Sequence, residues 1–128
     1  MTLLLDMHAF LWFLEDSPQL SATARIAIES RESQVFVSVV SLWEIAIKSS
    51  LGKLALKFSF SEVIHDQLGR NAMDLLPLDR AHLERLHALP FHHHDPFDRV
   101  LVAQALAGDL VFVTRDAQFA PYGARLLW

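Results

Sequence analysis

The chain lacks cysteine altogether, which excludes disulfide bonds and thiolate metal sites and is typical of a protein from a reducing compartment such as the cytoplasm. An excess of positive charge is also missing, because 11 Lys and Arg stand against 15 Asp and Glu, for a net charge of −4. A protein of this charge does not hold nucleic acid by its overall field. Binding of a nucleic acid would need a local basic patch or a bridging cation.

Long apolar segments are absent as well. Charged residues interrupt each apolar run well before the ~20 residues that a membrane-spanning helix needs. At the N-terminus, Asp6 and His8 interrupt the stretch that would have to form the apolar part of a secretion signal. No repeat, linker or low-complexity segment divides the 128 residues. We therefore expect one soluble globular domain over residues 1–128, with no membrane contact.

Short β-type runs alternate along the chain with longer helical patterns. Strands are predicted at 2–5, 35–38, 74–78, 110–114 and 125–127, and helices at 8–16, 21–31, 41–53, 59–70, 79–89 and 95–108. This order favours parallel strands with helical crossovers. Gly52 and Gly108 stand where helix C-caps are expected. The aromatic residues on helical apolar stripes, which are Phe10, Trp12, Trp43 and Phe97, are expected in the core.

Acidic residues follow several of the predicted strands. In open α/β sheets, ligands bind beyond the carboxyl ends of the strands. That rule selects Asp6 after the first strand, Glu44 in the helix after the second, and Asp116 after the fourth. Asp98 stands one turn into a strongly apolar helix, whose first turn we expect to be exposed. Asp6 interrupts an apolar run, so its carboxylate needs a cation, a donor or a metal ion.

Each of these acids also has a purely structural interpretation. Ser41-x-x-Glu44 matches a capping box. Asp95 is typical of an N-cap, with Pro96 at the first helical position. Asp116 can be an ordinary turn residue. The local pattern does not decide between these roles and a functional one.

The segment 92–99 reads "HHHDPFDR" and raises the question of a histidine metal site. Consecutive residues do not share one face of a helix or strand, so a tetrahedral zinc site from this run is not expected. A surface loop is the better interpretation. Of the three histidines, we expect His94, beside Asp95, to line the mouth of a cleft.

Four stretches together resemble a known family. "LLLDMHAFLWFL", "SVVSLWEIAIKSSLGKL", "LPFHHHDPFDRVLVAQA" and "VFVTRDAQFAPY" are similar to the PIN-domain family, and more narrowly to the VapC-type ribonuclease toxins of toxin–antitoxin pairs. The resemblance implies a three-layer α/β/α sandwich around a mainly parallel sheet. It also implies a metal-dependent endoribonuclease that acts on RNA as the toxin of such a pair, forms a homodimer and is inhibited by a cognate antitoxin.

The resemblance further assigns the acidic residues. It implies that Asp6, Glu44, Asp98 and Asp116 are the catalytic residues and the ligands of Mg²⁺ or Mn²⁺. Asp98 matches the family position before "RVLVAQA", so Asp95 keeps its capping role. Position 7 is Met where the family often has a small hydroxyl residue. A hydrogen bond that supports the metal ligands is therefore expected to be missing.

Such a site has a clear chemistry. Hard divalent cations prefer oxygen ligands, and a bound cation lowers the pKa of a water and orients it for in-line attack on a phosphodiester. An acidic cleft loaded with cations can then accept a phosphate that the bare protein repels. Lys48, Arg99 and Arg115 are candidate contacts to the flanking RNA phosphates, with a solvated surface cation as the alternative for each.

Two other functions compete with this one. The chain can be a catalytically silent PIN-like module that binds a partner through its apolar surface. A phosphatase of the haloacid-dehalogenase type would use Asp6 as a nucleophile, but it needs a second aspartate two residues on. His8 stands there instead.

Overall fold

The structure is a computed structural model that describes residues 1–128, and it has an α/β fold. The strands are β1 (Thr2–Leu5), β2 (Gln34–Ser38), β3 (Met73–Leu76), β4 (Val111–Val113) and β5 (Leu126–Leu127). They form one sheet in the order β3-β2-β1-β4-β5, and every neighbouring pair is parallel. This topology confirms the predicted parallel sheet with crossovers.

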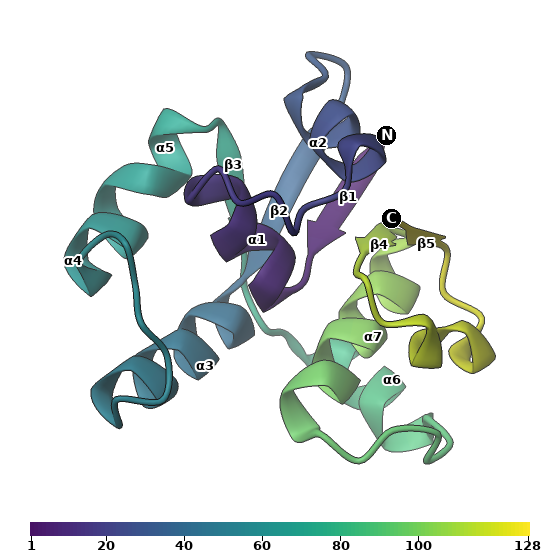
Figure 1. The fold of residues 1–128 in the computed structure, drawn as a ribbon. Helices are drawn as coiled ribbons and strands as arrows, with labels where there is room; N and C mark the ends of the chain where they lie inside the picture. The colour runs from purple at the N-terminus through teal and green to yellow at the C-terminus, as the bar shows by residue number, and fades with distance from the viewer.

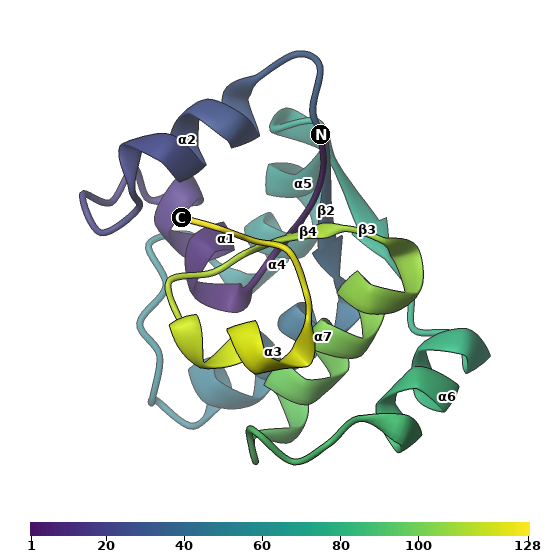
Figure 2. The same ribbon diagram turned by 90° about the vertical axis from the view of Figure 1, so that its right-hand side faces the viewer.

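Helices cover both faces of the sheet. They are α1 (Met7–Leu14), α2 (Ala22–Glu29), α3 (Val39–Ser50), α4 (Phe60–Glu62), α5 (Leu68–Arg70), α6 (Arg80–Ala88) and α7 (Pro96–Gly108). Figures 1 and 2 show α1, α2, α4 and α5 on one side of the sheet and α6 and α7 on the other. The predicted three-layer arrangement is therefore confirmed.

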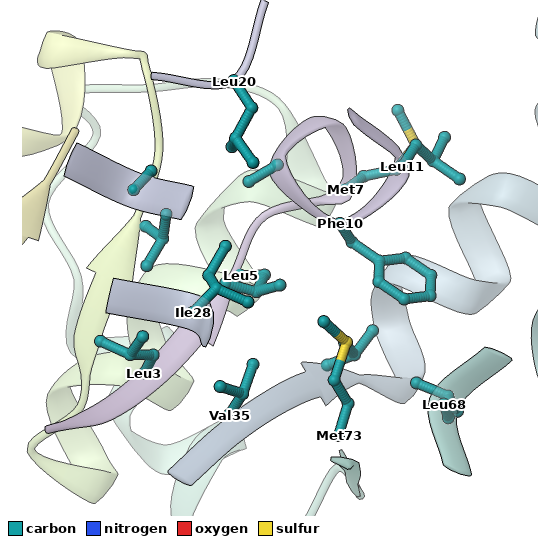
Figure 3. Packing of buried hydrophobic residues seen from close by; sticks show 14 of the residues in the cluster. Leu3, Leu5, Met7, Phe10, Leu11, Leu20, Ile28, Val35, Leu68 and Met73 are labelled. Carbon is teal, nitrogen blue, oxygen red and sulfur yellow. The ribbon is translucent and has the colours of Figure 1, made fainter. Parts of the chain in front are cut away.

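The central strand β1 explains why the sheet is covered twice. Its side chains alternate, so Leu3 and Leu5 join the core beneath α1 and α2, whereas Leu4 joins the core beneath α7. A strand that is buried on both faces reads as a continuous apolar run, as "LLL" does here. Figure 3 shows the first core, in which Phe10 of α1 and Met73 of β3 point into the same cluster.

The carboxyl ends of three strands meet at one edge of the sheet. The backbone N–H of Asp6, directly after β1, donates to the carbonyl oxygen of Val113 at the end of β4, at 3.1 Å. Ser38 at the end of β2 is at once the N-cap of α3, and its hydroxyl accepts the N–H of Val40 at 3.0 Å. The edge that the sequence selects for a site is therefore the place where α1, α3 and the segment after β4 begin.

Some of the predicted local roles are wrong. Helix α3 begins at Val39, before Ser41, so the capping box from Ser41 to Glu44 does not form. The hydroxyl of Ser41 is buried without a hydrogen-bond partner. Gly108 lies inside α7, and the left-handed residue that ends this helix is Asp109, with φ of 51°. Gly52, by contrast, follows the C-cap Leu51 with φ of 72°, as predicted.

The helix predicted over 59–70 and the core aromatic residues also differ in part from expectation. A π-helical turn (Val63–Gln67) separates α4 from α5. Phe10 is fully buried, but Trp43 is 58% exposed, because the buried residues of α3 lie on the other faces of the helix. None of the helices combines the length and the hydropathy that crossing a membrane requires.

Candidate active site

The four predicted acidic residues line one hollow of about 280 Å³ at the carboxyl edge of the sheet. They come from separate segments, namely the end of β1, helix α3, helix α7 and the segment after β4. The complete lining consists of Asp6, Met7, His8, Glu44, Lys48, Asp95, Asp98, Asp116 and Phe119. The fold thus brings together residues that lie as much as 110 positions apart in the chain.

Asp6 is held at the start of α1. Its Oδ1 accepts the backbone N–H of Ala9 at 2.7 Å, which makes it the N-cap of the helix. Burial raises the pKa of Asp6, while the hydrogen bonds from Ala9 and from the Thr114 side chain lower it. Met7 is buried in the core. The hydroxyl support that we expected to be missing at position 7 therefore comes from Thr114 in the segment after β4.

Glu44 is the most enclosed of the four acids, with a side chain that is 6% exposed. Its Oε2 accepts a hydrogen bond from Nζ of Lys48, one turn further along α3. This hydrogen bond is the main reason why the pKa of Lys48 is raised. The ammonium group predicted to contact RNA is thus engaged by Glu44, although Lys48 lines the acidic hollow.

Asp98 stands in the first turn of α7, and Asp95 caps that helix as predicted. Oδ1 of Asp95 accepts the backbone N–H of Asp98 at 3.1 Å, with Pro96 at the first helical position. Burial and the negative charge of Asp95 raise the pKa of Asp98 to about 7, and the charges of Glu44 and Asp6 add to the effect. The neighbouring carboxylates are therefore close enough to disfavour the ionised form of Asp98.

Asp116 is the N-cap of a 3-10 helix (Ala117–Tyr122). Its Oδ1 accepts the backbone N–H of Gln118 at 2.9 Å, and its own N–H donates to Oγ1 of Thr114 at 3.1 Å. The side chain is 39% exposed. Because Oδ1 points into the helix terminus, Oδ2 is left to face the hollow and its histidine neighbour.

His93 occupies the position in the site that the sequence had suggested for His94. Its Nε2 lies 3.6 Å from Oδ2 of Asp98 and 3.4 Å from Oδ2 of Asp116. The imidazole stacks on Phe119, with 5.0 Å between the ring centroids and 8° between the planes. His94 is exposed and stacks on Phe91 instead, so the expectation for His94 is wrong.

The hydrogen bonds of His93 determine which ring nitrogen faces the acids as a donor. Nδ1 accepts the backbone N–H of Asp95 at 3.3 Å, so in the neutral ring the proton is on Nε2. That N–H is directed at the two carboxylates. The backbone N–H of His93 donates to the hydroxyl of Tyr122 at 2.7 Å, which fixes the loop as well as the ring.

Arg99 does not fit the predicted RNA contact, because it is 7% exposed and its guanidinium is used inside the protein. Nη1 donates to the carbonyl oxygen of Pro90 at 2.8 Å, and Nη2 donates to that of Leu89 at 3.4 Å. The guanidinium also covers the ring of Phe91, at 4.0 Å from its centroid. Arg99 thus anchors the loop that carries His93. Of the three predicted cations, Arg115 remains exposed beside the site.

The chemistry of the donors suits a hard divalent cation. No group of three or more His, Asp or Glu side chains already surrounds a single point at ligand distances. Mg²⁺ is commonly held by one or two carboxylates and keeps several of its waters, so it does not require such a cage. The raised pKa of Asp98 among neighbouring negative charges is the condition that a cation relieves.

Comparison with known proteins identifies the family. The PIN-domain model matches residues 3–124, and the chain belongs to the PIN-domain family. Comparison with curated proteins gave no match.

Several solved structures share the fold over nearly the whole chain. The chain is similar to a structure of VapBC2 from Rickettsia felis bound to a promoter DNA fragment, with a TM-score of 0.73, 12% identity and coverage of 98% of this chain and 97% of that one. The structure of FitAcB from Neisseria gonorrhoeae has a TM-score of 0.64 and 18% sequence identity, and the match covers 97% of this chain and 95% of that one. The structure of VapBC-1 from nontypeable Haemophilus influenzae has a TM-score of 0.66 and 14% sequence identity, and the match covers 98% of this chain and 96% of that one.

Proposed function

We propose that the protein is a Mg²⁺- or Mn²⁺-dependent endoribonuclease that acts as the toxin of a toxin–antitoxin pair. The observation that carries the proposal is the convergence of Asp6, Glu44, Asp98 and Asp116 on one hollow from four separate segments. Capping explains single acids, but it does not explain why Glu44, which caps no helix, is buried beside the others. Membership of the PIN-domain family supports a nuclease.

The residues of the site have separate roles in the proposed reaction. Asp6, Glu44, Asp98 and Asp116 would hold the cation, which when bound supplies a water activated for in-line attack on the phosphodiester and neutralises charge on the phosphate. Lys48 holds the carboxylate of Glu44, and the hydrogen bonds of Ala9 and Thr114 hold that of Asp6. Arg115, the exposed cation beside the site, is the residue that remains to contact a flanking phosphate.

Metal removal tests the proposal directly. Chelator-treated protein is expected to lose cleavage of single-stranded RNA and to regain it with Mg²⁺ or Mn²⁺, because the carboxylates prefer hard cations. Fragment analysis on denaturing gels measures the result. Added monovalent salt is the control for general screening. Recovery with Zn²⁺ alone would contradict the carboxylate site and favour the histidines of the loop 92–94.

His93→Ala is expected to lower RNA cleavage about 10- to 100-fold, the usual cost of removing a group that orients metal ligands. The reason is its contact with both Asp98 and Asp116. His93→Gln should recover part of the loss, because its amide can donate to the same oxygens. His94→Ala is the matched control, since its ring is exposed and stacks on Phe91, whereas His93 contacts the acids. Equal rates of RNA cleavage for the His93 and His94 alanine variants would show that His93 does not contribute to the site.

An exposed apolar stripe on α3 supports the proposed protein partners. Val39, Trp43, Ile47 and Leu51 recur every four residues and are 37%, 58%, 37% and 62% exposed. Residues at this spacing share one face of a helix. The solved structures with a similar fold include those of VapBC2, FitAcB and VapBC-1. We propose that the chain forms a homodimer and binds a cognate antitoxin. A catalytically silent binding module would use the same stripe but would show no metal-dependent cleavage.

A further inference from the structure

A second hollow, of about 320 Å³, opens beside the acidic one. It is lined by Asp6, His8, Trp12, Arg115 and Asp116. Asp6, His8 and Asp116 line both hollows, so the second is continuous with the first. The predicted metal ligands thus form one wall of a space whose other walls are aromatic and cationic. Sequence reasoning assigned Trp12 to the core and left His8 without a role.

The aromatic and cationic walls are held in a defined arrangement. His8 and Trp12 lie one turn apart on α1, with ring centroids 5.3 Å apart and planes tilted by 42°. The guanidinium carbon of Arg115 lies 4.8 Å from the centroid of the Trp12 ring. The C-terminal Trp128 packs edge-on against Trp12, at 5.9 Å. The contact with Trp128 thus helps to hold the indole of Trp12, which is partly buried, while His8 and Arg115 are exposed.

We propose that this hollow binds the nucleotide adjoining the cleaved phosphodiester, with the base stacked on the His8 and Trp12 rings and Arg115 at the phosphate. The inference rests on the proposed nuclease function and adds the subsite that receives the substrate. Aromatic rings stack on any base, and arginine provides both a planar surface and phosphate contacts. A phosphate in the acidic hollow would place the neighbouring base within reach of this space, because the two hollows share a wall.

The charges favour a nucleotide over other occupants. Arg115 already supplies a positive charge, so a cationic side chain from a protein partner would meet repulsion there. A purely apolar ligand would find one apolar residue, Trp12, in the whole lining. A nucleotide matches both features, since it combines a flat ring with a negative phosphate.

Binding of a short RNA to the full chain tests the subsite without relying on cleavage. The probes are the pentaribonucleotide of adenosine and the same pentamer with one base removed at each position in turn, in the presence of Ca²⁺ to screen the carboxylates. Nuclear magnetic resonance of the three tryptophan indole N–H groups reports contact, with the Trp12 signal assigned from Trp12→Phe. The intact pentamer is expected to shift the Trp12 signal, and removal of the base at one position should abolish that shift.

Variants then assign the contact to the hollow. Trp12→Leu should weaken binding of the intact pentamer about 5- to 150-fold, as expected for loss of one stacked base. The variant should also bind the intact and the abasic pentamers equally well. Trp43→Leu is the matched control, because Trp43 lies outside both hollows. Since Trp12 also packs on Trp128, His8→Ala is the second variant. His8 is exposed, so His8→Ala should weaken binding of the intact pentamer, but not of the abasic pentamer, without lowering the stability of the protein.

The outcomes separate the subsite from the nuclease proposal. Equal binding of intact and abasic pentamers, or equal effects of Trp12→Leu and Trp43→Leu, would overturn the subsite even in a protein that cleaves RNA. A shift of the Trp12 signal by an arginine-rich peptide and not by RNA would also overturn it and would make the hollow a protein-binding site. Base-dependent binding in a protein that cleaves no RNA would support the subsite and refute the nuclease.

Discussion

Asp98→Asn is expected to lower the rate of RNA cleavage about 1000-fold while leaving the fold intact. The substitution removes one of the four negative charges of the site and almost no volume, and stabilisation of a phosphoryl transition state by a bound cation is worth several kcal/mol. Asp6→Asn and Glu44→Gln should act in the same direction. End-mapping of RNA fragments after a short pulse of expression measures the effect, with the intact chain as the reference.

Asp95→Asn is the matched control for Asp98→Asn. Asp95 lines the same hollow and lies three residues away, but its Oδ1 caps α7. Asparagine is also a good N-cap, so cleavage should stay within about 3-fold of the wild-type rate. An inactive Asp95 variant beside an active Asp98 variant would reverse the assignment within "DPFDR". Identical fragment maps for the wild type and Asp98→Asn would refute the nuclease proposal.

Asp98→Asn is also expected to stabilise the metal-free protein at pH 8. The pKa of Asp98 is raised from 3.8 to about 7 by burial and by its acidic neighbours. The native state therefore holds a proton that the unfolded chain has already lost, and the wild type loses stability as the pH rises from about 4 to about 7. The shift corresponds to at most about 4 kcal/mol, and solvent screening at the partly exposed carboxylate leaves about 2 kcal/mol.

Thermal melting at two pH values measures this effect. In a chain of this length, about 2 kcal/mol raises Tm by about 7 °C, so the variant should melt higher than the wild type by that amount at pH 8. Below about pH 3 the difference should shrink towards zero, because Asp98 is then largely protonated in both the folded and the unfolded states. Asp74→Asn, the same substitution at an exposed residue of β3, is the control. If Asp98→Asn melts below the wild type at pH 8, burial and the neighbouring carboxylates do not disfavour the ionised form of Asp98.

Mg²⁺ or Mn²⁺ should raise the Tm of the wild type in the same series. The unfolded chain has no preformed site, so a cation at about 100 times its Kd stabilises the native state by about 2.7 kcal/mol. Asp98→Asn should respond less, because it has lost a ligand and much of the charge repulsion. Equal concentrations of monovalent salt control for screening. A divalent response that is the same in both proteins would show that Asp98 is not part of the metal site.

Much of the fold and the positions of the acids could be predicted from the sequence. The apolar run at 2–5 must be buried on both sides, so it predicts a central parallel strand, and the charge that ends it must lie at the sheet edge. The pattern "DPFDR" likewise predicts the start of α7, with Asp95 as the cap. These are local properties, because backbone conformation and burial follow from neighbouring residues and their periodicity.

The roles of His93 and Arg99 could not be predicted in this way. Three adjacent histidines have equivalent chemistry, and His93 faces the acids because of its contacts with the hydroxyl of Tyr122, the ring of Phe119 and the backbone N–H of Asp95. Arg99 has the sequence context of a surface cation, yet its guanidinium is buried and donates hydrogen bonds to the carbonyl oxygens of Leu89 and Pro90. Trp12 and Trp43 have the same apolar helical context and differ in what packs around them.

The amino-acid sequence alone thus determined the order of strands and helices and the acids at the carboxyl ends of the strands, since both depend on local periodicity and capping. The tertiary structure decided which side chains share the site. Contacts such as that of His93 with Asp98 and Asp116 join segments that no local pattern relates, and the direction of a loop side chain depends on the packing of distant residues. The shift in the pKa of Asp98 has the same origin, because burial and the charges of Glu44 and Asp6 act on it only after the chain has folded.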